Sequence, residues 1–296
     1  MTVHPVRSAR SSRGRMGRPS TVLTIAMLAC LGYFLLPLVW IAVASTKDNS
    51  DLFSSFGLWF ADDFSLLANL RDVFTYDGAV YGRWLINTAL YAVLTAGGGA
   101  FLMAAAGYAF AQYKFAGSKV LFGIVLGSFM IPSTALVIPT YLLFSQIGLV
   151  NTPLAVILPS LVSPFGIYLM RVYAEGAVPD SLIEAARVDG AGEFRIFWQV
   201  TLRLLAPGIV TVLLFSLVGV WNNYFLPLIM LNDPKWFPIT VGLAQWQAKA
   251  SGGGGAEALF STVITGSMVS IIPLLAAFLF LQRYWVSGMS LGAVKG

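Results

Sequence analysis

Few residues of this 296-residue sequence could do acid–base, nucleophilic or metal chemistry. The one histidine, His4, lies in the N-terminal tail, and the one cysteine, Cys30, lies inside an apolar run. Histidine is the side chain whose charge changes most readily near neutral pH, and cysteines build disulfides and metal sites only in groups. We therefore predict that the chain has no catalytic residue and holds no metal or other cofactor itself.

The one charged and patterned stretch of the sequence is SLIEAARVDGAGEFRIFWQVTLRLLAPG, residues 181–208. Ser181 followed three residues later by Glu184 predicts a capping box at the start of a short helix. Asp189 and Gly190 predict its end, because glycine accepts a positive φ at a helix C-terminus. A second helix is predicted to follow, with an amphipathic stripe. The residues of that stripe are Phe194, Phe197, Trp198, Thr201 and Leu205.

Two interpretations of this charged stretch remain open from the residues alone. In one, it is a surface helix in the lipid headgroup layer, with its arginines near anionic lipid. In the other, the first short helix docks into another protein. Ala185 and Ala186 would then give it a slim face for close approach, and Gly190 would permit a sharp exit.

The elements around this stretch are predicted to be membrane helices. The chain is 57% hydrophobic and 10% charged, whereas a soluble domain is typically about 25% charged. A helix needs about 20 apolar residues to cross a bilayer, and six stretches meet that length. The first follows a basic tail but is too long for the apolar region of a signal peptide, so we predict a retained helix. The fold class is therefore an all-α membrane protein with six transmembrane helices, at about 21–44, 85–112, 119–146, 153–172, 205–231 and 259–282.

The distribution of Lys and Arg predicts the orientation, because these residues gather on the cytoplasmic side. With the N-terminal tail in the cytoplasm, only five of the 18 Lys and Arg lie outside, namely Lys47, Arg71, Arg83, Lys235 and Lys249. Both termini are therefore predicted to be cytoplasmic. The positive residues form no stripe typical of nucleic-acid binding, so no nucleic-acid partner is expected.

The predicted organisation is a cytoplasmic basic tail, residues 1–20, and a six-helix domain, residues 21–296. The domain has an inner loop at 174–204 and outer loops at 46–84 and 232–258. The first outer loop should fold into short amphipathic pieces, and the second ends in SGGGGA, a flexible tip. In the third span, Pro132 and Pro139 should kink the helix. In the second span, small residues should allow close helix packing, namely Ala96, Ala100 and Ala104.

Away from their ends, the six predicted spans contain no Asp, Glu, Lys, Arg or His. A proton-coupled carrier generally needs such groups at membrane depth. The polar residues at depth are neutral and could line a route for an uncharged polar solute, or could instead bond neighbouring helices and backbone carbonyls. They are Asn87, Ser128, Thr134, Ser163, Asn222, Asn223, Thr265 and Ser267.

The stretch EAARVDGAG resembles the EAA loop of membrane subunits of ATP-binding-cassette (ABC) importers. That pattern is EAA, three residues, Gly, nine residues and Ile-x-Leu-Pro, and here Arg203 stands where the proline is usual. YAFAQYKFAGSKVLF, IPSTALVIPTYLLFSQIGLVNTPLAVILP, WNNYFLPLIML and QRYWVSGMSLGAVKG are similar to the maltose-permease-like sugar permeases. The EAA pattern falls on Glu184, Ala185, Ala186 and Gly190, then on Val200, Leu202 and Arg203.

The resemblance implies the type I importer permease fold and a set of partners in the cytoplasmic membrane of a prokaryote. A second permease subunit would form a heterodimer with this chain, and two ATPase subunits would hold ATP and Mg. An external solute-binding protein or lipoprotein would contact the outer loop 232–258 and deliver a sugar. Membrane lipid would surround the assembly.

The same resemblance assigns roles to residues of this chain. The ATPase-coupling residues would be Glu184, Ala185, Ala186, Asp189 and Gly190. The tail at the ATPase interface would be Gly292, Ala293, Val294, Lys295 and Gly296. Asn222, Asn223 and Ser267 are predicted to lie near the solute path.

Three other functions compete with a sugar importer subunit. A stand-alone secondary carrier would work without ATPases, and a membrane enzyme acting on lipid-linked sugars would need a cluster of acidic or histidine residues, which the sequence does not show. An ABC importer for a non-sugar solute such as glycerol phosphate or a polyamine is the nearest rival. The chain has no G-x-x-x-x-G-K-[ST] pattern, so it is not expected to hydrolyse ATP itself.

Overall fold

The computed structural model describes residues 21–252 and 258–289, with side chains placed as far as Tyr284. Within these residues every regular element is helical. In chain order they are α1 (Thr21–Ala44), α2 (Asp51–Ser54), α3 (Leu66–Gln112), α4 (Ser118–Ser128), η1 (Ser133–Leu136), α5 (Val137–Gln146), α6 (Leu154–Ser160), α7 (Pro164–Ala177), α8 (Asp180–Val188), α9 (Glu193–Ile196), η2 (Phe197–Thr201), α10 (Leu202–Trp221), α11 (Phe225–Met230), η3 (Pro234–Trp236), α12 (Ile239–Ser251) and α13 (Phe260–Met289).

Five helical segments of the described chain are long and apolar enough to cross a membrane. A sixth span is formed if α4 and the η1–α5 segment, which meet at a short break, count as one. The prediction of an all-α protein with six spans is confirmed in this form. The five segments are Thr21–Ala44, Leu66–Gln112, Leu154–Ala177, Glu193–Trp221 and Phe260–Tyr284.

The third predicted span is bent far more sharply than a kinked helix. Its two halves, Ser118–Ser128 and Ser133–Gln146, differ in direction by 99°. Pro132 lies at the break with φ −58° and ψ 125°, outside the helical region. The expectation that Pro139 also kinks the span is wrong, because Pro139 lies in the first turn of α5, where a missing N–H breaks no helical hydrogen bond.

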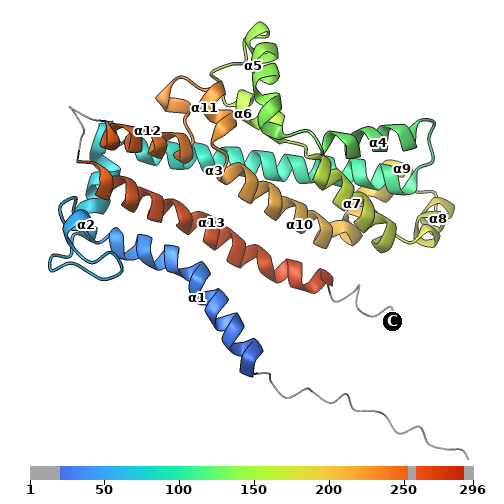
Figure 1. The fold of residues 1–296 in the computed structure, drawn as a ribbon. Coiled ribbons are helices and arrows are strands. Elements are labelled where there is room, and N and C mark those ends of the chain that lie inside the picture. Colours follow the sequence, from blue (N-terminus) through green and yellow to red (C-terminus); the bar gives the residue numbers. More distant parts are fainter. Residues whose placement is uncertain (1–20, 253–257, 290–296) are drawn as a thin grey trace, which may run out of the picture.

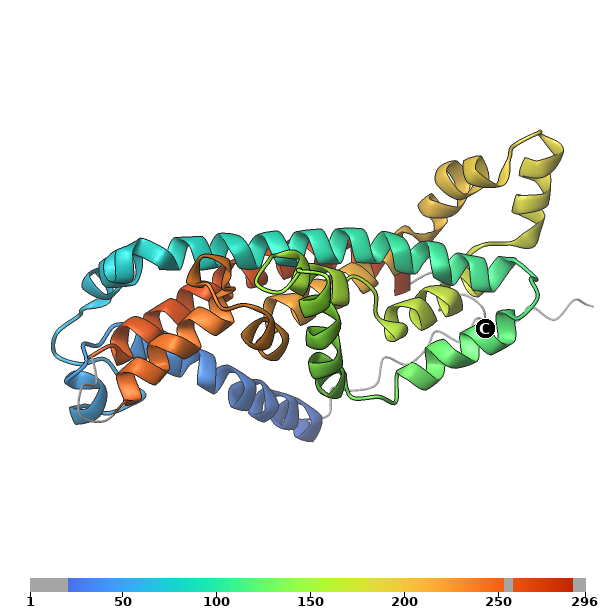
Figure 2. The ribbon, with the colours of Figure 1, turned by 90° about the horizontal axis from the view of Figure 1, so that it is seen from above.

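The long helix α3 is the axis of the molecule and packs against α7, α10 and α13. Figure 2 shows it running along the length of the bundle. The predicted close packing is confirmed, since Ala96, Ala100 and Ala104 are all buried. A Cβ added at Gly107 would lie 2.6 Å from the backbone nitrogen of Arg171, so α7 can approach α3 only because glycine stands there.

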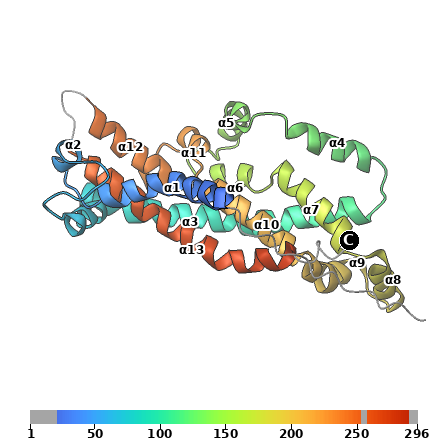
Figure 3. The same ribbon diagram turned by 60° about the horizontal axis from the view of Figure 1, so that its bottom comes forward.

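Two apolar clusters lie along α3. One contains Tyr81 and Trp84 of α3 with Trp246 of α12. The other contains Met103 and Tyr108 of α3, with residues of α7, α8, α9 and α10. Figures 1 and 3 show α2 and α12 at one end of the molecule and α8 and α9 at the other. The helix α3 therefore connects the two ends through packed side chains.

The first outer loop folds largely as helix. Helix α3 begins at Leu66 rather than near residue 85, and its first part is joined to the rest by non-helical residues from Tyr76 to Ala79. Asp77, Gly78 and Ala79 all have positive φ there. The expectation of short pieces thus holds for α2 and for the segment before Tyr76. The predicted basic tail, residues 1–20, and most of the predicted flexible tip lie outside the described residues.

Candidate functional site

The short helix predicted from the charged stretch exists as α8, but it begins differently from the prediction. The expected capping box is wrong: the N-cap is Pro179, in extended conformation with φ −66° and ψ 135°, and no side chain caps the helix. Because the helix starts at Asp180, Ser181 already lies in its first turn. Glu184 therefore has no capping role, and its carboxylate is exposed.

The end of α8 follows the prediction closely. Gly190 has φ +79°, in the left-handed region. The N–H of Gly190 donates to the carbonyl of Arg187, and the N–H of Ala191 donates to the carbonyl of Ala186, both at 3.0 Å. This pair of bonds is the Schellman motif, which satisfies the last helix carbonyls and fixes a sharp turn. Gly190, four residues after Ala186 in the sequence, therefore marks the C-terminus of α8.

The two faces of α8 have different surroundings. Ile183 is buried in the apolar cluster around Met103, and Ala186 packs against the same cluster. Glu184 and Ala185 lie on the exposed side, and Val188 is 88% exposed. The prediction that Ala185 and Ala186 together form a slim docking face therefore holds only for Ala185, which faces outward. Figure 2 shows α8 and α9, in yellow and gold, projecting from the helix bundle.

A hydrogen-bonded trio joins α8 to the end of α3. Glu193, at the start of α9, accepts from the Arg187 guanidinium at 2.7 Å and from the Tyr113 hydroxyl at 2.6 Å. Partial burial, and then the bond to Glu193, raise the pKa of Tyr113. The phenol therefore stays protonated and keeps donating at physiological pH. Sequence reasoning missed this trio, since Tyr113 is 80 residues from Glu193.

The five residues of the amphipathic stripe predicted for the second inner helix divide into two groups in the structure. Thr201 and Leu205 are buried, and Phe197 packs against the cluster around Met103. Phe194 is 79% and Trp198 52% exposed, with their rings stacked 5.9 Å apart. Ile196 is the buried residue at the start of this segment. The π-helical turn over Phe197–Thr201 shifts the side-chain register that a 3.6-residue period assumes for the residues after it.

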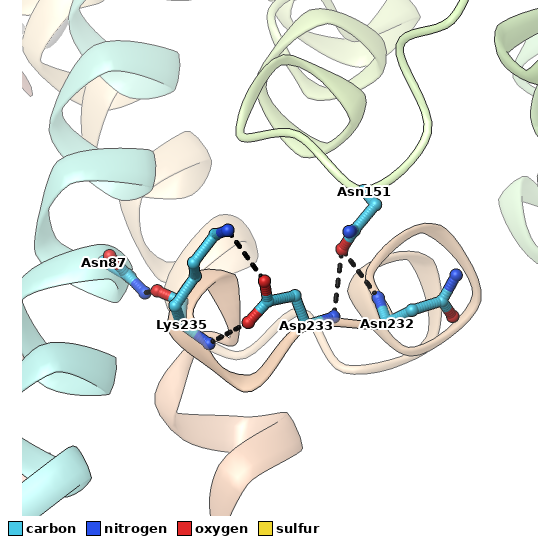
Figure 4. Close-up of polar contacts among 5 residues, drawn as sticks. All are labelled: Asn87, Asn151, Asn232, Asp233 and Lys235. Atoms are coloured by element: carbon cyan, nitrogen blue, oxygen red, sulfur yellow. Dashed lines mark hydrogen bonds and ion pairs between the residues drawn. The ribbon is translucent and has the colours of Figure 1, made fainter.

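At the opposite end of the molecule, the loop before α12 is held by side-chain contacts to its backbone. Asn151, itself at φ +62°, accepts from the N–H groups of Asn232 and Asp233 at 3.0 and 2.9 Å. Figure 4 shows this clamp beside the 2.8 Å ion pair between Asp233 and Lys235. The Lys235 ammonium lowers the pKa of Asp233, so this carboxylate stays charged.

Helix α3 holds the same loop from its other side. Asn87 donates to the carbonyls of Lys235 and Phe237 at 2.8 and 3.0 Å, and Tyr91 donates to that of Trp236 at 2.8 Å. The N–H of Ile239 donates to Thr88 at 2.7 Å. Of the two roles that the sequence leaves open for Asn87, the structure shows the bonding of backbone carbonyls. This loop is thus preorganised as a rigid surface.

The three predicted path residues fall in different places. Asn223 lines a cavity of about 330 Å³ between the α6–α7 junction and α10. Asn222 caps α10 by donating to the carbonyl of Val218, and Ser267 donates to the carbonyl of Val263 in its own helix; neither lines this cavity. Sequence reasoning did not single out Ser160 and Ser216, which line it too, because they are 56 residues apart and meet only in the fold.

The predicted tail residues Gly292–Gly296 lie outside the described residues, and the structure places none of them. Within the described residues, no group of three or more His, Cys, Asp and Glu side chains could hold a metal ion.

Several known proteins are similar to this chain in sequence and in fold. Residues 100–290 match the family described as "Binding-protein-dependent transport system inner membrane component". The chain is 32% identical over 280 residues to the arabinooligosaccharides transport system permease protein AraQ of Halalkalibacterium halodurans, covering 94% of this chain and 97% of that protein. It is 29% identical to the lactose transport system permease protein LacG of Rhizobium radiobacter, over 88% of this chain and 90% of that protein.

A solved structure has the same fold. It is a chain of a bacterial ABC transporter involved in the import of the acidic polysaccharide alginate, with TM-score 0.77 and 23% identity, covering 89% of this chain and 96% of that chain. The chain therefore belongs to the family of binding-protein-dependent transport system inner membrane components, and it is a membrane-spanning permease subunit of an ABC importer rather than an enzyme.

Proposed function

We propose that this subunit carries a sugar or sugar oligomer inward across the cytoplasmic membrane of a prokaryote, with α8 as the coupling helix that docks into an ATPase. The observation that carries this proposal is the exposed Glu184–Ala185 face of α8, fixed by the Gly190 turn at one end of the molecule. A short helix held rigidly to the bundle can transmit a push from a partner, since α8 is anchored by Ile183 in the apolar cluster.

The proposed assembly assigns a partner to each end of the molecule. The α8 end lies in the cytoplasm with both termini, where two ATPase subunits hold ATP and Mg. The α12 end lies outside, and its loop held by Asn87 and Asn151 is the surface for an external solute-binding protein. A second, different permease subunit completes the path. The tail Gly292–Gly296 contributes to the ATPase interface.

The sugar assignment is supported by the names of several relatives. Relatives with 29–32% identity are named as permeases for arabinooligosaccharides, for lactose and for melibiose, raffinose and stachyose. The neutral polar residues of the spans agree with an uncharged solute, whereas glycerol phosphate would favour basic groups on its route.

The energy source is the property that separates this proposal from a secondary carrier. The test is uptake of radiolabelled arabinotriose, lactose and raffinose into proteoliposomes that contain the purified complex with its binding protein. We expect uptake of one saccharide to require internal ATP and to survive a proton ionophore. Uptake that persists without the ATPase subunits and collapses with the ionophore would contradict the proposal.

A further inference from the structure

A small cavity opens where the membrane segment Leu154–Ala177 is interrupted. It lies between the α6–α7 junction and α10, near the outer end of α10, and has a volume of about 330 Å³. This is at the lower end of the range of small-molecule pockets, roughly 300–1,000 Å³. Its walls combine aromatic rings with several neutral polar side chains.

The polar side chains of this cavity can be compared with Thr211 and Ser267, which lie in the spans but outside the cavity. Thr211 and Ser267 bond to carbonyls of their own helices, at 2.9 and 2.8 Å. In the described part of the chain, the side chains of Ser160, Ser216 and Asn223 make no hydrogen bond, although all three line the cavity. A polar group at membrane depth without a partner is costly, so these three side chains need water or a solute.

The backbone around the cavity gives a second and independent indication. The membrane segment Leu154–Ala177 is broken into α6 and α7, and Ser163 in the break has an extended conformation with φ −114° and ψ 140°. Non-helical backbone at membrane depth is tolerated where it is buried in protein or lines a water-filled cavity. Here the break ends at the cavity wall, since Ser160, Ser163 and Phe165 all line it.

The aromatic side chains give the cavity an apolar surface opposite the hydroxyls. The rings of Phe165 and Phe215 lie 5.7 Å apart at an interplanar angle of 84°. A sugar ring has C–H faces that pack on aromatic rings and a rim of hydroxyls that both donate and accept hydrogen bonds. Serine hydroxyls and an asparagine amide can do the same toward that rim.

We infer that this cavity is a saccharide subsite within this subunit, with Ser160, Ser216 and Asn223 as hydrogen-bonding groups and Phe165 and Phe215 as the stacking surface. The inference rests on the proposed sugar transport and deepens it. It also separates two adjacent residues: Asn223 contacts the solute, and Asn222 only caps α10.

The test uses the fact that the chain has one cysteine, Cys30. In a Cys30→Ser background, Ser216→Cys and Asn223→Cys are made, with Ser267→Cys as the matched control outside the cavity. A membrane-impermeant methanethiosulfonate reagent is applied to the assembled complex, both at rest and trapped with ATP. The probe saccharide is the one of arabinotriose, lactose and raffinose that the wild-type complex transports.

We expect Ser216→Cys and Asn223→Cys to react in at least one state, and saturating saccharide to slow the reaction about five-fold or more, while Ser267→Cys stays unreactive. We also expect Asn223→Ala to raise the transport KM about five- to ten-fold, with Asn222→Ala unchanged. Stimulation of the ATPase by the binding protein should be the same in both alanine variants.

Several outcomes would overturn the inference. In a complex whose wild-type form transports saccharide, the cavity cysteines could react in neither state, or saccharide could leave their reaction rates unchanged. Asn222→Ala and Asn223→Ala could also change the transport KM equally. If the wild-type complex transports no saccharide, the proposed function itself fails, and the saccharide assignment of this cavity fails with it.

Discussion

Glu184 is an acid without an internal partner in the described part of the chain. Its carboxylate belongs to none of the ion pairs found there, and α8 starts too early for it to act as a cap. An exposed charge that contributes little to the fold is free to serve a partner. A cation in a groove of the ATPase would be the natural counterpart.

The first prediction therefore concerns the charge of Glu184. Glu184→Gln should leave the free energy of unfolding within about 0.5 kcal/mol, since the site is exposed. Uptake of the transported saccharide should fall at least about ten-fold, because the ATPase loses its charged contact. Glu175→Gln, which removes another exposed acid whose partner Arg171 lies on the same helix, is the control. Normal uptake by the Glu184→Gln variant would show that coupling does not need the charge of Glu184.

The second prediction concerns Glu193, which joins the coupling helix to α3. Exposed ion pairs contribute little stability, about 0–1 kcal/mol, so the role of this trio is positional. Glu193→Gln and Tyr113→Phe should each lower the amount of saccharide moved per ATP hydrolysed. Because both act through one contact, the double variant should be no worse than the worse single one. Additive losses in the double variant would show that the two residues act separately.

At the scale of the element, the turn after α8 decides where its exposed face points. No atom lies within 4 Å of a Cβ added at Gly190, so a side chain there meets no steric clash. The constraint is the φ of +79°, which costs a non-glycine residue roughly 1–2 kcal/mol. Asparagine tolerates this conformation better than alanine does.

The third prediction follows from that difference. Gly190→Ala should reduce coupled uptake several-fold by displacing the turn, and Gly190→Asn should restore most of it. Uptake and ATPase activity are measured together in proteoliposomes. Equal loss in both variants would mean that bulk at position 190, and not backbone conformation, is what the coupling helix cannot accept.

Among the elements of the inner loop, the sequence predicts the end of α8 but not its start or the irregular turn that follows α9. Gly190 marked the end of α8 because a left-handed C-terminus has a residue preference of its own. The predicted start of α8 is two residues too late, because the N-cap is the extended Pro179 and not Ser181. The π-helical turn over Phe197–Thr201 breaks the 3.6-residue period from which the amphipathic stripe is predicted.

The roles of the candidate site residues depend on contacts that are distant in the sequence. Asn222 and Asn223 are indistinguishable in the sequence, and only the packing of α10 sends one to the cavity and the other to a helix cap. Likewise, the partners of Asn87 lie about 150 residues away, so the sequence offered a polar residue at depth but not its role.

At the scale of the whole molecule, α3 links the two ends. It holds the loop before α12 through Asn87 and Tyr91, and its last turns reach Tyr108 and Tyr113 beside the coupling helix. From Trp84 to Tyr113 this is roughly 40 Å of chain at 1.5 Å per residue. A tilt of this one helix would therefore move the outer loop and the coupling helix together.

The most direct measurement of the central claim is site-specific crosslinking from the exposed face of α8. Ala185→Cys in a Cys30→Ser background carries a short photoreactive label, and Gly176→Cys on α7 serves as a second exposed position on the same side. In the assembled transporter, the account predicts a crosslink from position 185 to the ATPase subunit that changes in yield when ATP is bound. If position 185 crosslinks to lipid or to this chain alone in an assembly that transports actively, then α8 is not the contact through which ATP drives transport.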